Sequence, residues 1–370
     1  MITLNGLKRA VRLGSYACLV FGLCFALCLP AQAGVLVAAL PPGNAVTDPR
    51  SLLRLALPFE NDSIRQVQRS IEDITPQIRA RRWSAINGDV AKATTTLSRH
   101  KDEILASVPE SRRSQATELI DKISTGLTDL KSITEAKDGE RLNEKKNEVL
   151  DTIGTLEASM VEKFPYEVPK AYDTFPQLKG RATVAIETSK GTLTVVADGY
   201  SAPVTAGNFV DLVQRGFYNG LPFTRSEESY VLQTGDPQGP EVGFVDPTSG
   251  KYRSIPMEIL VQGDKVPFYG STLEEAGRYL DNPVLPFSAY GAVAMAPPDT
   301  DPNGASSQFF FFLFEPELTP AGRNLLDGRY AVFGYVVSGQ EVLGEIKEGD
   351  KIVSAKVVDG LENFVKPKVA

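Results

Sequence analysis

Histidine is almost absent from this sequence of 370 residues, which contains a single one, at position 100. A zinc site with several histidine ligands is therefore excluded. His100 lies between Arg99 and Lys101 in a stretch with a helical pattern, which favours a solvated surface residue over a catalytic base. A histidine-based catalytic triad is consequently not expected.

Cysteine is also scarce, and all three cysteines lie near the N-terminus, before residue 29. The same segment has a basic start at Lys8, Arg9 and Arg12, followed by an uncharged apolar run over Ser15–Leu29. Small residues then occupy the first and third positions of Ala31–Ala33. This layout is typical of a secretory signal peptide.

Removal of a signal peptide spanning residues 1–33 would leave a chain without cysteine, and so without disulfides, thiolate nucleophiles or cysteine metal sites. The segment carries three basic and no acidic residues, so its loss would change the formal net charge from −7 to −10. An uncleaved anchor is the alternative, although the apolar run is shorter than the roughly 20 residues that cross a bilayer. An acidic exported chain without cysteine fits a periplasm-like or lumenal compartment.

Basic charge is not in excess, because 39 lysines and arginines face 46 aspartates and glutamates. The composition therefore lacks the excess of basic residues that is typical of nucleic-acid-binding proteins. A hydrophobic content of 42% and a charged content of 23% are ordinary for soluble protein, and the length suggests two domains. We expect a soluble chain that meets membranes only through its partners.

The N-terminal half has a helical pattern after an extended, proline-containing lead-in over residues 34–58, in which a short helix over 51–57 is an option. Residues 59–163 repeat apolar positions at steps of three and four, as at Ile64 and Val67. Breaks divide this stretch into four segments, which predicts an all-α four-helix bundle, with Asp62 or Ser63 capping the first helix. A partner-binding face or an intermolecular coiled coil is the alternative for the apolar stripes.

The C-terminal half changes to strand periodicity after a proline-rich linker over residues 164–177. Many strands and two helices, the first capped by Thr205, predict a closed β-barrel with two capping helices over residues 178–362. Residues 363–370 form a tail. The fold class is therefore multidomain, with a helical bundle followed by a closed barrel.

Five segments follow one another in this C-terminal half: Phe217–Arg225, Tyr230–Pro237, Gly291–Ala296, Gly304–Phe310 and Leu326–Gly334. Together they resemble the cyclophilin family of peptidyl-prolyl cis-trans isomerases, over about residues 178–360. The resemblance implies an enzyme that rotates Xaa–Pro bonds of exported proteins and needs no metal and no other cofactor.

The helical half, the linker over Pro165–Pro169 and an insertion around Pro267–Glu275 resemble the multidomain cyclophilins of the thylakoid lumen. The N-terminal bundle of that group is similar to small extrinsic subunits of photosystem II. The resemblance implies proline-containing clients, photosystem II subunits among them, and a role in photosystem II assembly or repair. Neither a nucleic acid nor a metal is implied as a partner.

The resemblance also assigns the site. Arg225 is expected to donate to the twisted amide, and Gln233 is expected to hold Arg225 and meet the peptide carbonyl. Gln308 is expected to bond the peptide backbone. The side chains expected to line or flank the proline cup are Phe223, Tyr230, Met295, Phe310, Leu325 and Tyr330.

Several positions depart from the family pattern. Thr224 and Tyr330 stand where the family usually has histidine, Leu325 where it commonly has tryptophan, and Pro297 where it often has asparagine. Proline has no N–H with which to anchor a peptide. Weak or absent activity is therefore the alternative, in which the chain is a peptide-binding chaperone or assembly scaffold, autoinhibited by the helical domain.

Overall fold

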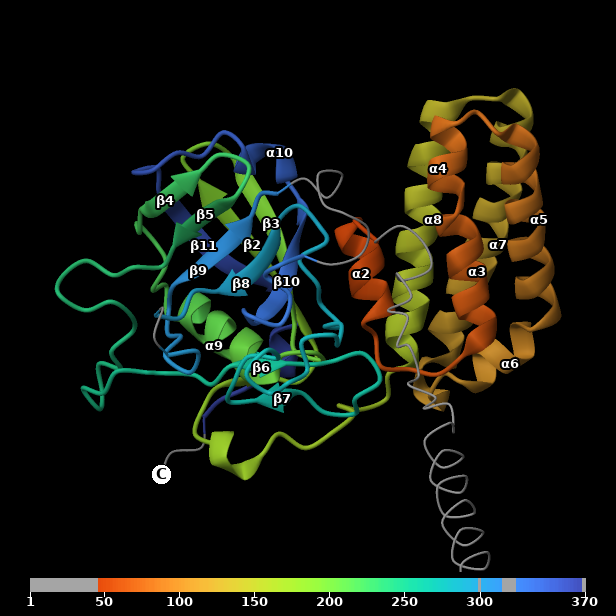
Figure 1. Ribbon diagram of the computed structural model, residues 1–370. Helices are drawn as coiled ribbons and strands as arrows, with labels where there is room; N and C mark the ends of the chain where they lie inside the picture. The colour runs from red at the N-terminus through yellow and green to blue at the C-terminus, as the bar shows by residue number, and fades with distance from the viewer. Residues whose placement is uncertain (1–45, 299–300, 315–323, 368–370) are drawn as a thin grey trace, which may run out of the picture. The chain divides into compact units, whose positions relative to one another are not determined.

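The computed structural model describes residues 46–298, 301–314 and 324–367 (Figure 1). The expected signal peptide and the first part of the lead-in lie outside the described residues. In the ranges that are described, no helix is both long and apolar enough to cross a membrane.

Four long helices form the core of the N-terminal domain: α3 (Asp62–Glu72), α5 (Trp83–Arg99), α7 (Arg113–Ala136) and α8 (Gly139–Met160). Each of them packs against two of the others, in the cyclic order α3, α5, α7, α8. Two short helices, α4 (Ile74–Arg79) and α6 (Lys101–Ala106), complete the domain. The long helices bury the apolar positions that the sequence repeats at helical spacing. These include Ile64, Val67, Ile71, Ile120, Ile123, Leu127, Ile153 and Leu156.

The start of α3 differs from the prediction by one residue. Asn61, and neither Asp62 nor Ser63, is the N-cap, because its side-chain oxygen accepts the Ile64 N–H at 2.9 Å. The backbone of Asn61 is extended, as a capping residue requires, whereas Asp62 is already helical.

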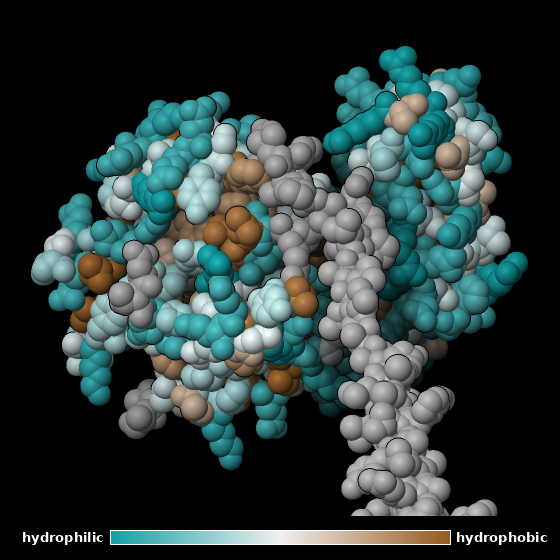
Figure 2. Space-filling view, in the orientation of Figure 1, coloured by the Kyte–Doolittle hydropathy of each residue, from teal (hydrophilic) through white to brown (hydrophobic). Residues whose placement is uncertain are grey.

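The helical domain exposes no large apolar side chain between residues 59 and 163. Its surface in Figure 2 is mainly hydrophilic, whereas the brown patches gather over the sheet domain. The apolar stripes are therefore used inside the domain, which argues against the alternative of an apolar docking face or an intermolecular coiled coil.

The short helix that the lead-in offered over residues 51–57 is present, although it begins and ends two residues earlier. This helix, α2, spans Pro49–Leu55, and Pro49 occupies its first turn. Proline is favoured there because the first N–H groups of a helix have no partner within it. Asp48 caps the helix by accepting the Ser51 N–H at 2.7 Å. Pro49 thus starts a helix rather than prevents one.

The C-terminal domain is built on an eight-stranded antiparallel sheet. Its strands follow the order β11 (Ile352–Asp359), β2 (Arg181–Thr188), β3 (Thr192–Asp198), β10 (Val332–Ser338), β8 (Ala292–Met295), β9 (Phe309–Phe312), β5 (Val231–Thr234) and β4 (Phe223–Glu227). Two small sheets pair β1 (Gln177–Leu178) with β12 (Phe364–Val365), and β6 (Glu258–Ile259) with β7 (Phe268–Tyr269).

The prediction of a closed barrel is wrong for the strand ladder, because β11 and β4 are the two edges of a half-barrel and do not pair as strands. Backbone bonds join the two edges where these strands begin. The Phe223 N–H donates to Asp350 and the Ile352 N–H to Leu221, and the N–H groups of Gly349 and Gly220 donate back to Phe223 and Ile352. A bulge follows Phe223. Because a bulge bends its strand, we attribute the open edge to it.

The inner face of the sheet holds the main core and is covered by α9 (Pro203–Gln214), which packs on β1, β3, β10 and β11. Thr205 does not cap α9, since Ala202 is the N-cap and offers no side-chain bond. The carboxylate of Glu258, from β6, instead accepts the N–H groups of Val204 and Thr205 at 3.2 and 2.8 Å. Burial raises the pKa of Glu258 to about 7, and these N–H bonds oppose the rise.

The second helix expected in this domain is short, because α10 spans only Gln340–Leu343. The outer face of the sheet is covered in part by α2, whose Leu52, Leu53 and Ala56 share an apolar cluster with Phe310 and Phe312. From the sheet domain, Arg181 of β2 donates a hydrogen bond to the carbonyl of Leu53. The short helix is thus bonded to the sheet as well as packed on it.

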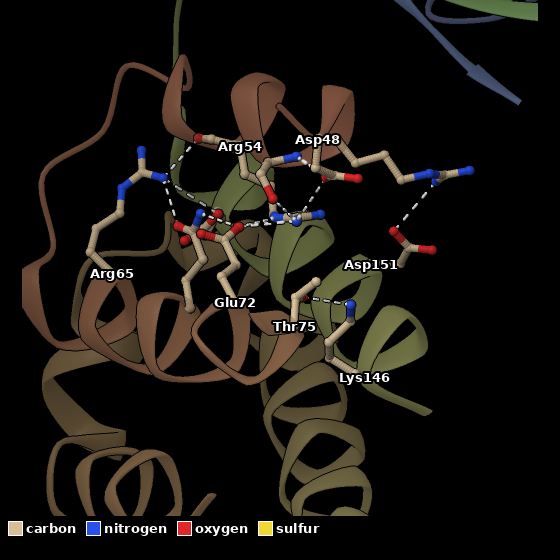
Figure 3. A network of polar contacts seen from close by, with 11 residues as sticks. Asp48, Arg54, Arg65, Glu72, Thr75, Lys146 and Asp151 are labelled. Carbon is tan, nitrogen blue, oxygen red and sulfur yellow. Dashed lines mark hydrogen bonds and ion pairs between the residues drawn. The ribbon is translucent and has the colours of Figure 1, made fainter. Parts of the chain in front are cut away.

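A polar network fixes α2 to the helical domain (Figure 3). Arg54 of α2 donates from Nε and Nη2 to Oε1 of Glu72 at 3.1 and 3.0 Å. Arg65 of α3 donates to the carbonyls of Arg54 and Leu57 at 2.7 and 2.9 Å. Glu157 of α8 lies in the same network, fully buried and 3.6 Å from Nη1 of Arg65.

We expect Arg54→Ala to lower the free energy of unfolding by about 2 kcal/mol, because it leaves a mostly buried carboxylate without its counter-ion. The side chains of Arg54 and Glu72 are 7% and 18% exposed. Urea unfolding followed by circular dichroism measures the change. Arg50→Ala is the control, since Arg50 and Asp151 are about half exposed and such pairs contribute at most about 1 kcal/mol. Equal losses in the two variants would contradict the role given to the network.

Candidate active site

The bulge in β4 decides where Arg225 points. Phe223 pairs with Thr234, whereas Arg225 pairs with Gln233, so two residues of β4 oppose one residue of β5. Without the bulge, Phe223 and Arg225 would face the same side of the sheet. With it, Phe223 enters the inner core and is fully buried, while the Arg225 side chain is 49% exposed on the outer face.

Register then assembles a site on the outer face of three neighbouring strands. Gln233 of β5 lies opposite Arg225 of β4 on one side and opposite Phe310 of β9 on the other. Val231, two residues before Gln233, faces the same way. A pocket of about 240 Å³ lies there, lined by Arg225, Tyr230, Val231, Gln233, Ala296, Pro297, Phe310, Leu326 and Tyr330.

The aromatic wall of this pocket is held rigidly. The ring of Phe310 is stacked on Phe287, with centroids 5.9 Å apart and an interplanar angle of 3°. Tyr330 meets Phe310 edge-to-face at 5.3 Å and 85°. Phe310 is only 5% exposed. A ring fixed on two sides offers a preformed apolar surface on which a proline ring can pack.

The polar groups of the pocket pair differently from the expectation. Nε2 of Gln233 donates to Oε1 of Gln308 at 2.7 Å, and Gln308 in turn donates to Asp236 at 3.1 Å. Arg225 donates instead to Glu227, with Nε and Nη2 both 2.6 Å from Oε1. The Arg225 guanidinium lies 5.9 Å from the centroid of the Tyr230 ring. Gln233 therefore neighbours Arg225 across the strands but orients Gln308.

The structure does not bring three of the predicted cup residues to the pocket. Phe223 and Met295 are 0% and 1% exposed and belong to the inner core. Leu325 is 87% exposed and is not among the residues that line the pocket, whereas Leu326 is. The other predicted cup residues, Tyr230, Phe310 and Tyr330, do line it.

The sequence reasoning missed four lining residues: Val231, Ala296, Pro297 as a wall, and Leu326. Strand alternation could have found Val231, because it lies two residues from Gln233. Met295 faces inward because it pairs with the fully buried Phe309 on the neighbouring strand, a pairing that the sequence alone does not reveal. In the described part of the chain, no group of three or more histidine, cysteine, aspartate or glutamate residues is placed to hold a metal ion.

Each of the two domains matches a known protein family. Residues 183–362 match the family described as cyclophilin type peptidyl-prolyl cis-trans isomerase/CLD. Residues 48–161 match the PsbQ-like domain of CYP38-like peptidyl-prolyl cis-trans isomerases. A protein of Synechocystis, named as a thylakoid lumen peptidyl-prolyl cis-trans isomerase, is 56% identical over 337 residues, which cover 91% of this chain and 89% of that one. The chain belongs to the cyclophilin family.

Two plant cyclophilins are also similar over most of this cyclophilin. The chloroplastic peptidyl-prolyl cis-trans isomerase CYP38 of Arabidopsis thaliana is 45% identical and is matched over 90% of this chain and 78% of its own. The chloroplastic CYP37 of the same plant is 33% identical over 94% of this chain and 76% of its own. These relatives confirm the resemblance to multidomain lumenal cyclophilins and the assignment of this cyclophilin to the isomerases of the thylakoid lumen.

Proposed function

We propose that this cyclophilin binds a proline of a client polypeptide in the pocket beside Arg225 and accelerates rotation of the preceding peptide bond. One observation carries the proposal. Arg225, Gln233 and Phe310 are cross-strand neighbours on β4, β5 and β9 and line one pocket of about 240 Å³. A guanidinium, an amide and an apolar ring are the three groups that such a rotation needs.

The chemistry requires no covalent step. Rotation about an Xaa–Pro bond meets a barrier of roughly 18–20 kcal/mol, which comes mostly from amide resonance. In the twisted form the nitrogen is pyramidal and basic, so a guanidinium donor nearby lowers the energy of that form. Phe310 and Tyr330 hold the proline ring. Gln233 and Gln308 orient each other by their mutual hydrogen bond and bind the backbone of the peptide. The site acts by electrostatic preorganisation.

The clients that we propose are proline-containing polypeptides of the lumen, photosystem II subunits among them. The support is the PsbQ-like match over residues 48–161, in a chain whose C-terminal domain carries the isomerase pocket. We further propose that the four long helices form a bundle of this type, and that residues 1–33 are removed on export. We also propose the domain limits predicted from the sequence, with a helical domain over residues 59–163, a linker over 164–177 and a cyclophilin domain over 178–362.

A specific observation supports the second candidate, a peptide-binding scaffold with little activity. Pro297 lines the pocket without an N–H to offer, and Leu325, in place of the usual tryptophan, is 87% exposed. Because α2 shares an apolar cluster with Phe310, we also propose that the helical domain modulates the pocket. Binding without rate acceleration would distinguish the scaffold from the enzyme.

An isomerisation assay on the full mature chain tests the proposed function. We expect it to accelerate exchange of an Ala-Pro peptide, and we expect Leu325→Ala to change the rate less than twofold, because that side chain lies outside the pocket. Absence of acceleration above the uncatalysed rate would contradict the enzymatic function. A large loss in Leu325→Ala would show that the peptide binds elsewhere than we propose.

A further inference from the structure

Glu227 does not itself line the pocket but lies next to it, opposite a lining residue and on the same face of the sheet as Arg225. It is the last residue of β4 and lies opposite Val231, which lines the pocket. The one residue between Arg225 and Glu227, Ser226, faces the other side, since it pairs with Leu232, which is fully buried in the inner core. Strand alternation after the bulge therefore puts Arg225 and Glu227 on one face, together with Val231.

The Glu227 carboxylate is bonded to the residue that the chemistry depends on. Its Oε1 accepts a hydrogen bond from Nε of Arg225 at 2.6 Å and forms an ion pair with Nη2 of the same guanidinium at 2.6 Å. The Arg225 and Glu227 side chains are 49% and 50% exposed, so the pair stands at the open lip of the pocket. An ion pair exposed to this extent is weak enough for a third charged group to compete with it.

We propose that Glu227 determines specificity, by selecting clients that carry a lysine or arginine beside the proline. A basic client side chain shares the Glu227 carboxylate and releases the Arg225 guanidinium toward the amide. An acidic side chain at the same place is repelled by Glu227 and competes for Arg225, which withdraws the guanidinium from the amide. The inference rests on the proposed function, because it concerns the substrates of the same pocket.

The size of the preference follows from the exposure of the pair. Exposed ion pairs change an equilibrium by factors of roughly 1.5 to 5. Attraction of a basic client and repulsion of an acidic one act together, so we expect about a fivefold range in kcat/KM. The preference should fade in 0.5 M salt, at which the Debye length is only about 4 Å.

The test uses the full mature chain and peptides that differ only in the residue next to proline, which is lysine, alanine or glutamate on either side. We expect kcat/KM to fall in the order lysine, alanine, glutamate in at least one of the two series. In Glu227→Gln the range should shrink below twofold, and the rate with the alanine peptide should rise, because the Arg225 guanidinium is released from its ion pair. Glu228→Gln is the matched control, since it removes the same charge one residue beyond β4 and should keep the order.

Two results would overturn the inference: an unchanged order in Glu227→Gln, or an equal loss of the order in both variants. Failure of the proposed function is a separate outcome, in which no peptide is isomerised by the wild-type chain. In that case the inference about Glu227 is tested by peptide dissociation constants, measured by fluorescence anisotropy. A preference for lysine that Glu227→Gln removes supports the inference, and its absence from the wild type contradicts it.

Discussion

Replacing Arg225 by alanine is expected to lower kcat/KM for an Ala-Pro peptide about 100-fold, which is the usual cost of removing one preorganised donor. The apolar wall of Phe310 and Tyr330 stays in place, so most of the loss should appear in kcat rather than in KM. Arg225→Lys should recover only part of the rate, because an ammonium keeps the charge but lacks the planar fork of donors. Peptide exchange rates measured by NMR give both parameters.

The matched control is Arg215→Ala. Arg215 follows α9, is ion-paired with Asp211 at 2.7 Å and has a side chain that is 36% exposed, but it does not line the pocket. It should keep the rate within twofold. If Arg225→Ala were as active as Arg215→Ala, the guanidinium would have no part in the rotation, whatever the pocket binds.

Glu157→Gln is expected to change how the stability of the chain depends on pH. Glu157 is fully buried, and neither of its carboxylate oxygens accepts a hydrogen bond. Burial raises the pKa of Glu157 from the ordinary 4.5 to about 8, although Arg65 and Arg54 nearby act in the opposite direction. Between pH 4.5 and 8, therefore, the unfolded chain ionises this group while the folded chain keeps it protonated.

The sign follows from that difference in bound protons. The unfolded state binds fewer protons, so the free energy of unfolding falls as the pH rises through this window. The limiting slope is about 1.4 kcal/mol per pH unit for one group. Glutamine cannot ionise, so at pH 8 we expect Glu157→Gln to be more stable than the wild type by about 2–4 kcal/mol, whereas at pH 4 the two should be nearly equal.

Urea unfolding at a series of pH values measures this effect. Glu258, whose pKa burial raises to about 7, adds a slope of the same sign, so the informative quantity is the difference between wild type and variant. Glu148→Gln, which removes an exposed glutamate from the same helix, is the control for charge alone. If the free energy of unfolding depended on pH in the same way in the wild type and in Glu157→Gln, the claim that the buried Glu157 carboxyl is protonated would be contradicted.

Much of the fold follows from local pattern. Helical spacing identified the buried face of α3, where Ile64, Val67 and Ile71 are all fully buried. The linked segments of the C-terminal half gave the domain type and placed Arg225, Gln233 and Phe310 on the strands that meet at the pocket. These features depend on residues close in sequence, or on a motif whose order fixes the topology.

The predictions from the sequence are wrong where residues that are distant along the chain determine the local structure. A bulge between Phe223 and Arg225 reverses the face of one of them, and nothing in the local alternation signals it. The carboxylate at the start of α9 comes from Glu258, 53 residues along the chain from Thr205. Local propensity favoured Thr205 as the cap, but a capping group supplied by a separate strand leaves no local trace.

The partner of Arg225 is a similar case. The family pattern indicated Gln233, the cross-strand neighbour, whereas the structure pairs Arg225 with Glu227. A carboxylate two residues along a regular strand lies on the same face as the arginine, and an ionised acceptor forms a stronger bond than an amide. Charge therefore decides between two neighbours that geometry alone leaves equivalent.

Exchange spectroscopy on an Ala-Pro peptide with a small amount of the isotopically labelled mature chain tests the central claim most directly. We expect cross-peaks between the cis and trans forms of the peptide, together with shift changes centred on Gln233, Phe310 and Tyr330. Cis–trans exchange at the uncatalysed rate, or shift changes confined to residues away from these three, would contradict the assignment of this pocket as the site of prolyl isomerisation.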